Sequence, residues 1–392
     1  MALLLNYHPS KCIYPCHSKQ GTIFRNTPRV RRKNMDNKQV RIAFVGCGGH
    51  ANHSLYPVLH RIGEIDLVAV VDRVEEKRLR VQRLFGARRT YAEVDEMLDA
   101  EKPEGVCIVG PPQMHYEVGM QVLERGIPIF VEKPSSIDFE HAYSLAEAAR
   151  KAGTFGMTAF MKRFATAYQE AKAITTSPEF DPISMVSIRY THGAYPLIWG
   201  LAPEPLCCLI GNQCHAFDLA RFFGGDVTEL YARLCDHGQG RFAFAVTVGF
   251  QNGAVGLLNS NATDDPAWNI RETLNVSGLL CSVDVEDMIY LDYRPRDSWA
   301  PNLRHVAWRQ GKYALPHAVA YGQGGAYLGY EGELRHFAAC IRTGETPISS
   351  LYDGAAALAI AEAIWESVHI GKPVRLAQQS PLSKGGRGVV TS

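Results

Sequence analysis

Residues Arg41–Leu59 read RIAFVGCGGHANHSLYPVL, an apolar run that leads into a glycine-rich turn and the start of a helical pattern. Gly46, Gly48 and Ala51 fit G-x-G-x-x-A, and Asp72 ends the next apolar run, LVAVVD. In such a unit the first glycine permits the tight turn, the second lets a pyrophosphate approach the backbone, and the third small residue allows close helix–strand packing. The helix N-terminus favours the negative charge of the phosphates. The stretch therefore predicts a dinucleotide site.

Apolar runs alternate with helical patterns up to about residue 160, which predicts a doubly wound parallel sheet. The runs GVCIVG (105–110) and IPIFV (127–131) are continuously apolar, as expected for parallel strands that are covered on both faces. Ligands bind at the carboxyl ends of such strands, so polar residues that follow a strand are candidates for the site. We expect strands at 40–45, 67–71, 105–109, 128–131 and 155–160, with helices at 74–84, 114–125 and 139–152.

The pattern changes after about Met161. Many of the later strand-like segments alternate polar and apolar residues and are joined by short turns, which indicates a mostly antiparallel sheet with one exposed face. We expect strands at 185–190, 229–234, 242–251, 254–260, 272–277 and 279–285, with helices at 165–174, 216–223, 329–343 and 355–368. The predicted fold class is α/β plus α+β, an N-terminal Rossmann doubly wound parallel sheet with a C-terminal, mostly antiparallel open-sheet domain.

The two ends of the chain differ in composition from the rest. The first 35 residues contain no Asp or Glu and carry the basic cluster RVRRK at 29–33. An organelle transit peptide and an upstream start codon before Met35 both stay open, and we favour the second. The last residues are rich in Gly and Ser, which is typical of a disordered tail. The expected division is an N-terminal extension (1–38), a dinucleotide-binding domain (39–160), a substrate-binding and oligomerisation domain (161–374) and a tail (375–392).

Composition and charge exclude several classes of protein. The 392 residues include 41 basic and 40 acidic ones, and the formal net charge of +1 argues against a nucleic-acid binder or a protein drawn to membranes by charge. No apolar run is long enough to span a bilayer. Ten cysteines lack a framework spacing, which suits a reducing compartment, and we expect a cytoplasmic protein. The cluster Cys207, Cys208, Cys214 and His215 lacks a zinc spacing, so we expect no metal site.

Several motifs together resemble the Gfo/Idh/MocA family of nicotinamide-dependent oxidoreductases, over residues 39–374. The resemblance implies a Rossmann domain, a six-stranded and mostly antiparallel second domain, bound NAD(P), and homodimers or homotetramers built through the sheet. The motifs are RIAFVGCGGHA (41–51), GVCIVGPPQMHYEVG (105–119), GIPIFVEKP (126–134), FMKRF (160–164), CHAFDLARFFGG (214–225) and the closing stretch 334–364.

The resemblance implies catalytic roles for Lys133 and His215. In similar proteins the lysine of the Glu-Lys-Pro motif lies beside the nicotinamide and the substrate hydroxyl, where an ammonium stabilises developing negative charge. His215 matches the catalytic histidine of H-x-x-D, and an imidazole can take the hydroxyl proton. Asp218, three residues on, is either a hydrogen-bond partner of the ring or a helix-stabilising acid.

The remaining candidates would contact the cofactor or the substrate. A carboxylate at Asp72 accepts hydrogen bonds from the ribose 2′-OH and favours NAD, whereas Arg73 could meet a 2′-phosphate, so NADP stays open. Ion pairs are the alternatives for Glu132 and Arg163, and a polar helix-turn residue for His115. The expected cofactor contacts are Gly46, Gly48, Gly49, His50, Ala51, Asp72, Arg73, Pro111, Pro112, His115, Glu132, Lys133 and Arg163, and the expected substrate contacts are Lys133, Asn212 and His215.

One departure from the family bears on the reaction. Sugar and inositol dehydrogenases that the chain resembles usually carry Asp four residues before the histidine, where this chain has Gly211. The predicted function is hydride transfer between NAD(P) and a small molecule, an alcohol of a sugar, cyclitol or sugar derivative. A transient-redox lyase or glycosidase and a non-catalytic NAD-binding regulator stay open as alternatives. Loops at 195–206 and 268–271 are expected to form walls of the substrate pocket.

Overall fold

The computed structural model describes residues 39–376, apart from 181, 265–269, 297–304 and 310–327. The predicted N-terminal extension therefore lies outside the described residues, as does the predicted tail from residue 377 onward. In the described part of the chain, no helix is both long enough and apolar enough to cross a bilayer.

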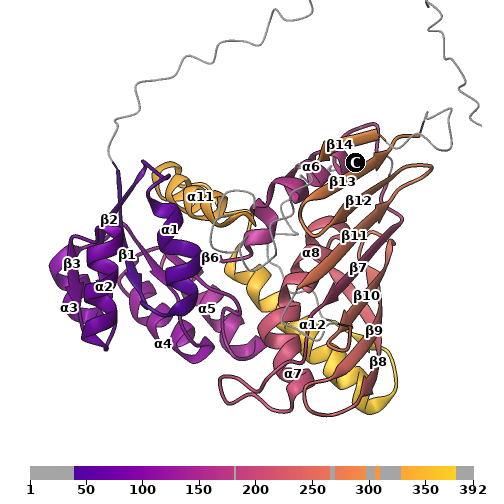
Figure 1. Ribbon diagram of the computed structural model, residues 1–392, viewed down its shortest axis with the longest axis horizontal. Helices are drawn as coiled ribbons and strands as arrows, with labels where there is room; N and C mark the ends of the chain where they lie inside the picture. Colours follow the sequence, from indigo (N-terminus) through magenta and orange to yellow (C-terminus); the bar gives the residue numbers. More distant parts are fainter. Residues whose placement is uncertain (1–38, 181, 265–269, 297–304, 310–327, 377–392) are drawn as a thin grey trace, which may run out of the picture. The chain divides into compact units, whose positions relative to one another are not determined.

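The first sheet has six parallel strands in the order β3-β2-β1-β4-β5-β6, which confirms the predicted doubly wound arrangement (Figure 1). The chain order reverses between β1 and β4, so the crevice at their carboxyl ends is the expected ligand position. The strands are β1 (Val40–Val45), β2 (Ile65–Val71), β3 (Arg89–Tyr91), β4 (Gly105–Ile108), β5 (Ile129–Val131) and β6 (Gly156–Thr158).

Helices cover both faces of this sheet, because alternate side chains of β1 enter two apolar clusters. Ile42 and Phe44 pack with residues of α1 and α2, and Ala43 and Val45 with residues of α3, α4 and α5. The sequence did not predict β3 or α3, which are short and mostly polar. The helices are the π-helix η1 (Ala51–Leu55), α1 (Tyr56–Leu59), α2 (Glu75–Phe85), α3 (Val94–Glu101), α4 (Pro112–Leu123) and α5 (Phe139–Lys151).

The second sheet has nine described strands in the order β14-β13-β12-β11-β7-β10-β9-β8-β15. Only β7 and β10 pair in parallel, so the predicted mostly antiparallel sheet is confirmed. The resemblance implied six strands, and β13, β14 and β15 extend that set at its edges. The bounds are β7 (Met185–Thr191), β8 (Val227–Asp236), β9 (Phe242–Phe250), β10 (Val255–Asn261), β11 (Arg271–Ser277), β12 (Ser282–Glu286), β13 (Tyr290–Arg294), β14 (His305–Arg309) and β15 (Val374–Arg375).

Two C-terminal helices join the sheets. The ring of Phe337 in α11 lies 5.8 Å from that of Phe130 in β5. Leu351, the first residue of α12, packs into the core of the first sheet, and the same helix lies against β8 and α8. The domain boundary at residue 160 stays a prediction. The helices after β6 are η2 (Met161–Phe164), α6 (Thr166–Thr175), α7 (Glu204–Cys208), the π-helix η3 (Leu209–Gln213), α8 (Cys214–Gly224), α11 (Tyr330–Thr343) and α12 (Leu351–Ile370).

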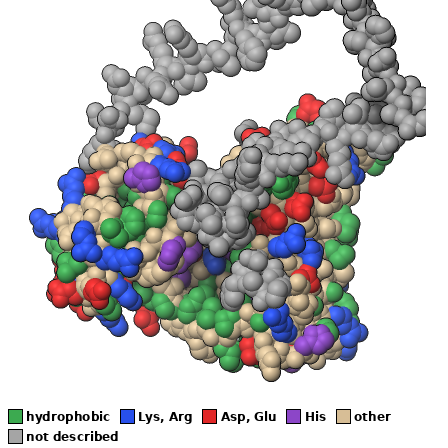
Figure 2. Space-filling model, in the orientation of Figure 1, with side chains coloured by type: hydrophobic (Ala, Val, Ile, Leu, Met, Phe, Trp, Pro, Cys, Tyr) green, Lys and Arg blue, Asp and Glu red, His purple; other side chains and the backbone are tan. Residues whose placement is uncertain are grey.

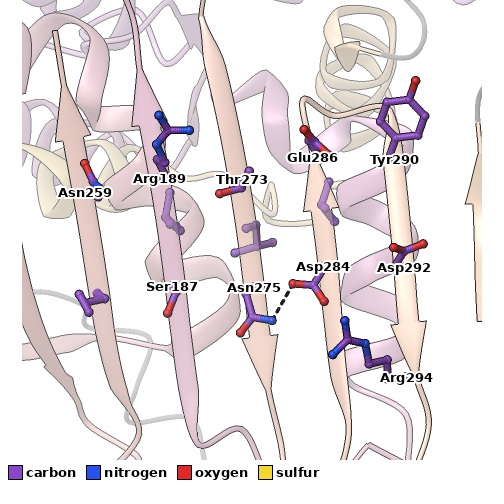
Figure 3. Close-up of a pocket in the computed structure, with 14 residues that line it drawn as sticks. Ser187, Arg189, Asn259, Thr273, Asn275, Asp284, Glu286, Tyr290, Asp292 and Arg294 are labelled. Carbon is purple, nitrogen blue, oxygen red and sulfur yellow. Dashed lines mark hydrogen bonds between the residues drawn. The ribbon is translucent and has the colours of Figure 1, made fainter. Parts of the chain in front are cut away.

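The outer face of the second sheet is polar (Figure 3). A depression of about 460 Å³ on this face is lined by residues of β7, β10, β11, β12 and β13, among them Arg189, Asp284 and Arg294. None of the predicted site residues lines it. On the face of the molecule in Figure 2, basic and acidic side chains are interspersed, in keeping with the formal net charge of +1.

Gly46 fixes how the turn after β1 meets the end of β4. Its φ is 110°, and a Cβ at this position would lie 1.9 Å from the carbonyl oxygen of Val109. A side chain is therefore excluded by both conformation and space. The Gly46 N–H donates to the Val71 carbonyl at 2.8 Å, and its carbonyl accepts from the Tyr56 hydroxyl at 2.9 Å. The turn is thus bonded to β2 and to the first helix.

We expect Gly46→Ala to lower the free energy of unfolding by about 2–4 kcal/mol, because the new methyl group forces β1 away from β4. Gly63→Ala is the matched control, since a Cβ there meets nothing within 4 Å, and it should change stability by less than about 0.5 kcal/mol. Urea unfolding of both variants measures the difference. Equal losses would contradict a special role for Gly46.

Candidate functional site

One cavity of about 650 Å³ brings together residues that follow strands of the first sheet and residues of the second half of the chain. Predicted residues that line it are Gly48, Gly49, His50, Ala51, Pro111, Glu132, Lys133, Asn212 and His215. Predicted residues that do not line it are Gly46, Asp72, Arg73, Pro112, His115 and Arg163. The first group comes from the ends of β1, β4 and β5 and from the segment η3–α8, so the topology of the first sheet and one helix of the second half build the cavity together.

The glycine turn leaves open space for a ligand. A Cβ added at Gly48 or Gly49 would meet nothing within 4 Å. Asn52 fixes the turn, because its Nδ2 donates to the carbonyls of Cys47 and Gly48 at 2.8 Å. Both glycines line the cavity: Gly48 directly precedes the helical run and Gly49 is its first residue. The geometry fits a pyrophosphate lying against this backbone.

Asp72 follows β2 and braces the same turn. Its two carboxylate oxygens accept from the backbone N–H groups of Cys47 and Val74, each at 2.9 Å. Each oxygen keeps a further lone pair, so the carboxylate can still accept from a ribose hydroxyl. The following residue, Arg73, is exposed. The preference for NAD stays a prediction.

Glu132, at the end of β5, is held by two donors. His50 Nε2 lies 2.9 Å from Oε1, and the Lys133 N–H donates to Oε2 at 3.0 Å. The residue is 4% exposed. Burial raises its pKa, but the neighbouring His50 and Lys133 outweigh burial and hold the pKa below its usual range. Glu132 is therefore an ionised acceptor that orients His50 toward the cavity.

His115 joins the ends of β4 and β5. Its Nε2 accepts from the Gly110 N–H at 2.9 Å, and its Nδ1 lies 2.8 Å from the carbonyl oxygen of Pro134. Burial lowers the pKa of His115 to about 4. The ring is therefore neutral, with a proton on Nδ1, and both nitrogens are used by backbone groups. These contacts favour a structural role over direct contact with a cofactor.

Lys133 and His215 meet in the cavity. Lys133 Nζ donates to the carbonyl oxygen of Gly211 at 3.3 Å. His215 is 6% exposed, and its Nδ1 has no hydrogen-bond partner among the described residues. Burial, reinforced by the charges of Lys133 and Lys162, lowers the pKa of His215 well below its usual range. A neutral imidazole thus lies beside an ammonium, which suits a base paired with an oxyanion donor.

The π-helix η3 places Gly211 and Asn212 one turn before His215. Asn212 Oδ1 accepts from the Tyr190 hydroxyl at 3.4 Å, whereas its buried Nδ2 has no partner among the described residues. An amide donor that lines a cavity without a partner is a candidate contact for a ligand oxygen. Single π-helical turns are frequent at functional sites, and the other described one, η1, also borders this cavity.

Arg163 and Asp218 belong to a buried ion network instead. The Arg163 guanidinium donates to Asp218 at 2.9 and 2.6 Å, to Asp353 at 3.1 Å and to the carbonyl oxygen of Ile348. Of the two alternatives for Asp218, the hydrogen bond to the ring of His215 is absent among the described contacts, because Arg163 occupies that carboxylate. These contacts favour the ion-pair alternative for Arg163.

The sequence did not single out several apolar residues of the wall. The expected loop at 195–206 does contribute Tyr195, Ile198 and Trp199, and Ile270 comes from the expected loop at 268–271. Residues 268 and 269 of that loop lie outside the described residues. The lining residues without a site prediction are Val109, Tyr190 and Tyr330. Aromatic residues in strands usually signal core packing, so Tyr190 carried no distinguishing signal. Among the described residues, no cluster of His, Cys, Asp and Glu is arranged to hold a metal ion.

Comparisons with known proteins agree with this geometry. Residues 40–160 match the family model GFO_IDH_MocA, described as an oxidoreductase family with an NAD-binding Rossmann fold. The chain is 26% identical over 347 residues to scyllo-inositol 2-dehydrogenase (NAD(+)) of Bacillus subtilis (strain 168), covering 86% of this chain and 96% of that protein. It is 23% identical to D-apiose dehydrogenase of Paraburkholderia graminis, covering 86% and 90%.

Solved structures share the fold. A dehydrogenase from Chromobacterium violaceum has a TM-score of 0.76 and 22% identity, covering 85% of this chain and 96% of that one. Levoglucosan dehydrogenase, solved in complex with NADH, has a TM-score of 0.73 and 19% identity, covering 87% and 100%. The match of residues 40–160 to this family model bears out the resemblance over that segment and confirms the predicted NAD-binding Rossmann fold.

The stability of the protein should fall at acidic pH through His115. Its pKa is about 4 in the folded protein and 6.5 when unperturbed. Between these values the unfolded chain binds the proton and the folded one does not, so stability decreases as pH falls from 6.5 to 4, by up to about 3 kcal/mol. His115→Gln should flatten this dependence in urea unfolding, whereas His60→Gln, at an exposed position, should not. An unchanged slope would contradict the assignment.

Arg163→Met tests whether that residue supports the fold or the cofactor. Removing the guanidinium leaves Asp218 buried without its partner, which should lower the free energy of unfolding by about 3–5 kcal/mol. The dissociation constant for NAD, measured by calorimetry at a temperature where the variant is folded, should change less than about twofold. A large loss of NAD affinity with little loss of stability would assign Arg163 to cofactor binding.

Proposed function

We propose that the protein is an NAD(P)-dependent dehydrogenase that oxidises a secondary alcohol of a sugar, cyclitol or sugar derivative. The observation that carries the proposal is the convergence of Lys133, His215 and Asn212 on the cavity that the glycine turn borders. The named activities of the relatives, scyllo-inositol 2-dehydrogenase and D-apiose dehydrogenase, support an alcohol substrate. A homodimer or homotetramer stays part of the proposal.

The residues of the turn would hold the cofactor. Gly48 and Gly49 leave room for the pyrophosphate, and Asp72 offers a free lone pair to a ribose hydroxyl. His50, oriented by Glu132, lines the same cavity as Lys133 and would contact the bound cofactor there. When bound, the nicotinamide supplies the acceptor for the hydride. The fit of these residues supports NAD as the preferred cofactor.

Lys133 and His215 divide the proton chemistry. The Lys133 ammonium donates a hydrogen bond to the reacting oxygen and stabilises the negative charge that develops there. His215 is neutral, so its imidazole can take the hydroxyl proton. Asn212 Nδ2 donates to a second oxygen of the substrate and fixes the ring orientation. The product is a ketone, since the carbon loses a hydride and its oxygen a proton.

Cofactor reduction by the purified protein tests this function, with NAD and NADP offered separately and a panel of sugars and inositols as substrates. Lys133→Ala should lower kcat by roughly 10²- to 10³-fold, because it removes the donor to the developing oxyanion. NAD affinity should change little. The control is Lys151→Ala, an exposed lysine on α5, which should leave kcat unchanged.

Two results would overturn the proposal. An unchanged kcat in Lys133→Ala would remove Lys133 from the chemistry. Tight NAD binding without net reduction by any substrate would favour one of the alternatives. Exchange of substrate hydrogen with solvent would then indicate transient redox chemistry, and its absence a regulator.

A further inference from the structure

A second buried lysine lies behind the wall of the cavity. Lys162, in η2, is 1% exposed, and its ammonium forms a salt bridge with the equally buried Glu272 of β11. The other carboxylate oxygen of Glu272 accepts from the Tyr168 hydroxyl at 2.6 Å. Taking two charges out of water is costly, and apolar residues of similar size often replace such a pair without loss of stability. The stability of the fold is therefore a weak reason for a lysine at this position.

The positive end of this ion pair is directed toward the cavity. Lys162 Nζ lies 5.2 Å from the centroid of the Tyr190 ring, and Tyr190 lines the cavity. Glu272 contacts Tyr168 through its carboxylate and Asp287 through its backbone N–H, and none of these three described residues belongs to the lining. The ammonium is thus the charge that lies against the wall, with its carboxylate on the side away from the cavity.

The segment η2 fixes Lys162 beside the helix that carries His215. The Phe160 ring, directly before η2, meets the His215 ring edge-on, with their centroids 6.1 Å apart. Arg163, directly after Lys162, binds Asp218 of α8, three residues beyond His215. Lys162 therefore lies between two contacts of its own segment with the helix of the candidate base.

The charges that act on His215 are positive. Burial is the largest cause of its lowered pKa, and the neighbouring groups that lower this pKa further are Lys133, Lys162 and His50. The carboxylate on the same helix, Asp218, is bound by Arg163.

The ion pair keeps Lys162 charged. Burial lowers the pKa of Lys162, and the nearby ammonium of Lys133 lowers it further, whereas the carboxylates of Glu272 and Asp287 oppose both effects. The Glu272 carboxylate is in direct contact, so the two groups persist as ammonium and carboxylate.

We propose that Lys162 is a positioning residue of the site, whose ammonium is fixed behind Tyr190 by Glu272 and keeps His215 free to accept the proton of the substrate hydroxyl. The inference rests on the proposed dehydrogenase function and adds a residue that lies outside the cavity lining. The same positive charge favours the substrate oxygen as it loses its proton, because a preorganised charge in a buried site stabilises a developing oxyanion.

The test variant combines Lys162→Met with Glu272→Gln, which removes both charges and keeps the size of both side chains. Lys162→Met alone would leave Glu272 buried without its cation, which is strongly destabilising. We expect the double variant to lower kcat roughly 10-fold at pH 7 without changing the dissociation constant for NADH. The acid limb of the pH profile of kcat/KM should move upward by about one pH unit, because His215 then takes up a proton more easily. Lys162→Arg keeps the charge and should retain the wild-type profile.

The matched control combines Arg221→Met with Asp226→Asn and removes another salt bridge of the second half of the chain. The two charged groups are 2.6 Å apart, and neither residue lines the cavity. Asp353, the other partner of Arg221, keeps its contact with Arg163. Both kcat and the pH profile should stay unchanged in this control.

Urea unfolding tests the charge of Lys162 without any turnover. A histidine whose pKa is lowered in the folded protein makes stability decrease as pH falls below about 6.5, because the unfolded chain binds the proton first. The variant without Lys162 and Glu272 should lose less stability between pH 6.5 and pH 4 than the wild type. This difference should disappear when His215→Gln is added to both proteins.

The outcomes separate the two proposals. An unchanged kcat and pH profile without Lys162 and Glu272, or an equal loss in the control without Arg221 and Asp226, overturns the inference and leaves the dehydrogenase standing. If the wild-type protein reduces no cofactor but unfolding shows the expected dependence on His215, the proposed function is overturned and the action of Lys162 on His215 is kept. If neither is observed, both proposals are overturned.

Discussion

The site depends on how the ends of β4 and β5 are held together inside the protein. Gly110 and Pro134 lie beyond Ile108 and Val131, the last residues that pair between these strands. The neutral ring of His115 bridges them, since it accepts from Gly110 and donates to Pro134. Gly110 and Lys133 then face the same cavity from neighbouring strands. A single imidazole thus links the backbone of Gly110, which lines the cavity, to the segment that carries Lys133, the residue proposed to bind the reacting oxygen.

A second buried acid near Lys133, Glu333, adds no negative charge to the site. Glu333 in α11 is fully buried, and neither of its carboxyl oxygens has a hydrogen-bond partner in the described part of the chain. Burial and the charge of Glu132 raise the pKa of Glu333 well above its usual range. The group is therefore a neutral acid, and Glu132 is the carboxylate that neighbours Lys133. The ammonium keeps positive charge available for a developing oxyanion.

The sequence predicts much of the first sheet because the signals that mark its strands lie within short stretches of the chain. Continuous apolar runs give the parallel strands, and the topology places the residues that follow them at one crevice. This reasoning predicted that Lys133, Glu132 and the glycine turn lie at the site. It could not find β13, because the turn before that strand uses Asp287 and Met288 at positive φ, where pattern rules expect glycine or asparagine. The Asp287 carboxylate accepts from the Glu272 N–H at 2.8 Å, a contact between distant residues.

The contacts of Arg163 and Asp218 show the same limit. A spacing of three residues on one helix allows Asp218 to meet the ring of His215. An arginine 55 positions earlier in the chain takes the carboxylate instead. Sequence spacing reports which groups share a helix face, whereas the partner of a buried charge is decided by which opposite charge is buried with it. The candidate site was therefore predictable at the strand ends and not in its supporting contacts.

Gly211 shows how such long-range packing changes chemistry. A carboxylate at this position could both pair with Lys133 and pass on a proton. Here the ammonium donates to the Gly211 carbonyl, which accepts a hydrogen bond but takes no proton. Proton removal then falls to His215, whose neutral ring lacks a partner at Nδ1 among the described residues. The space that the carboxylate would occupy belongs to Tyr195 and Trp199. Glycine at position 211 thus leaves His215 as the candidate base and gives the space of a side chain to the two aromatic residues.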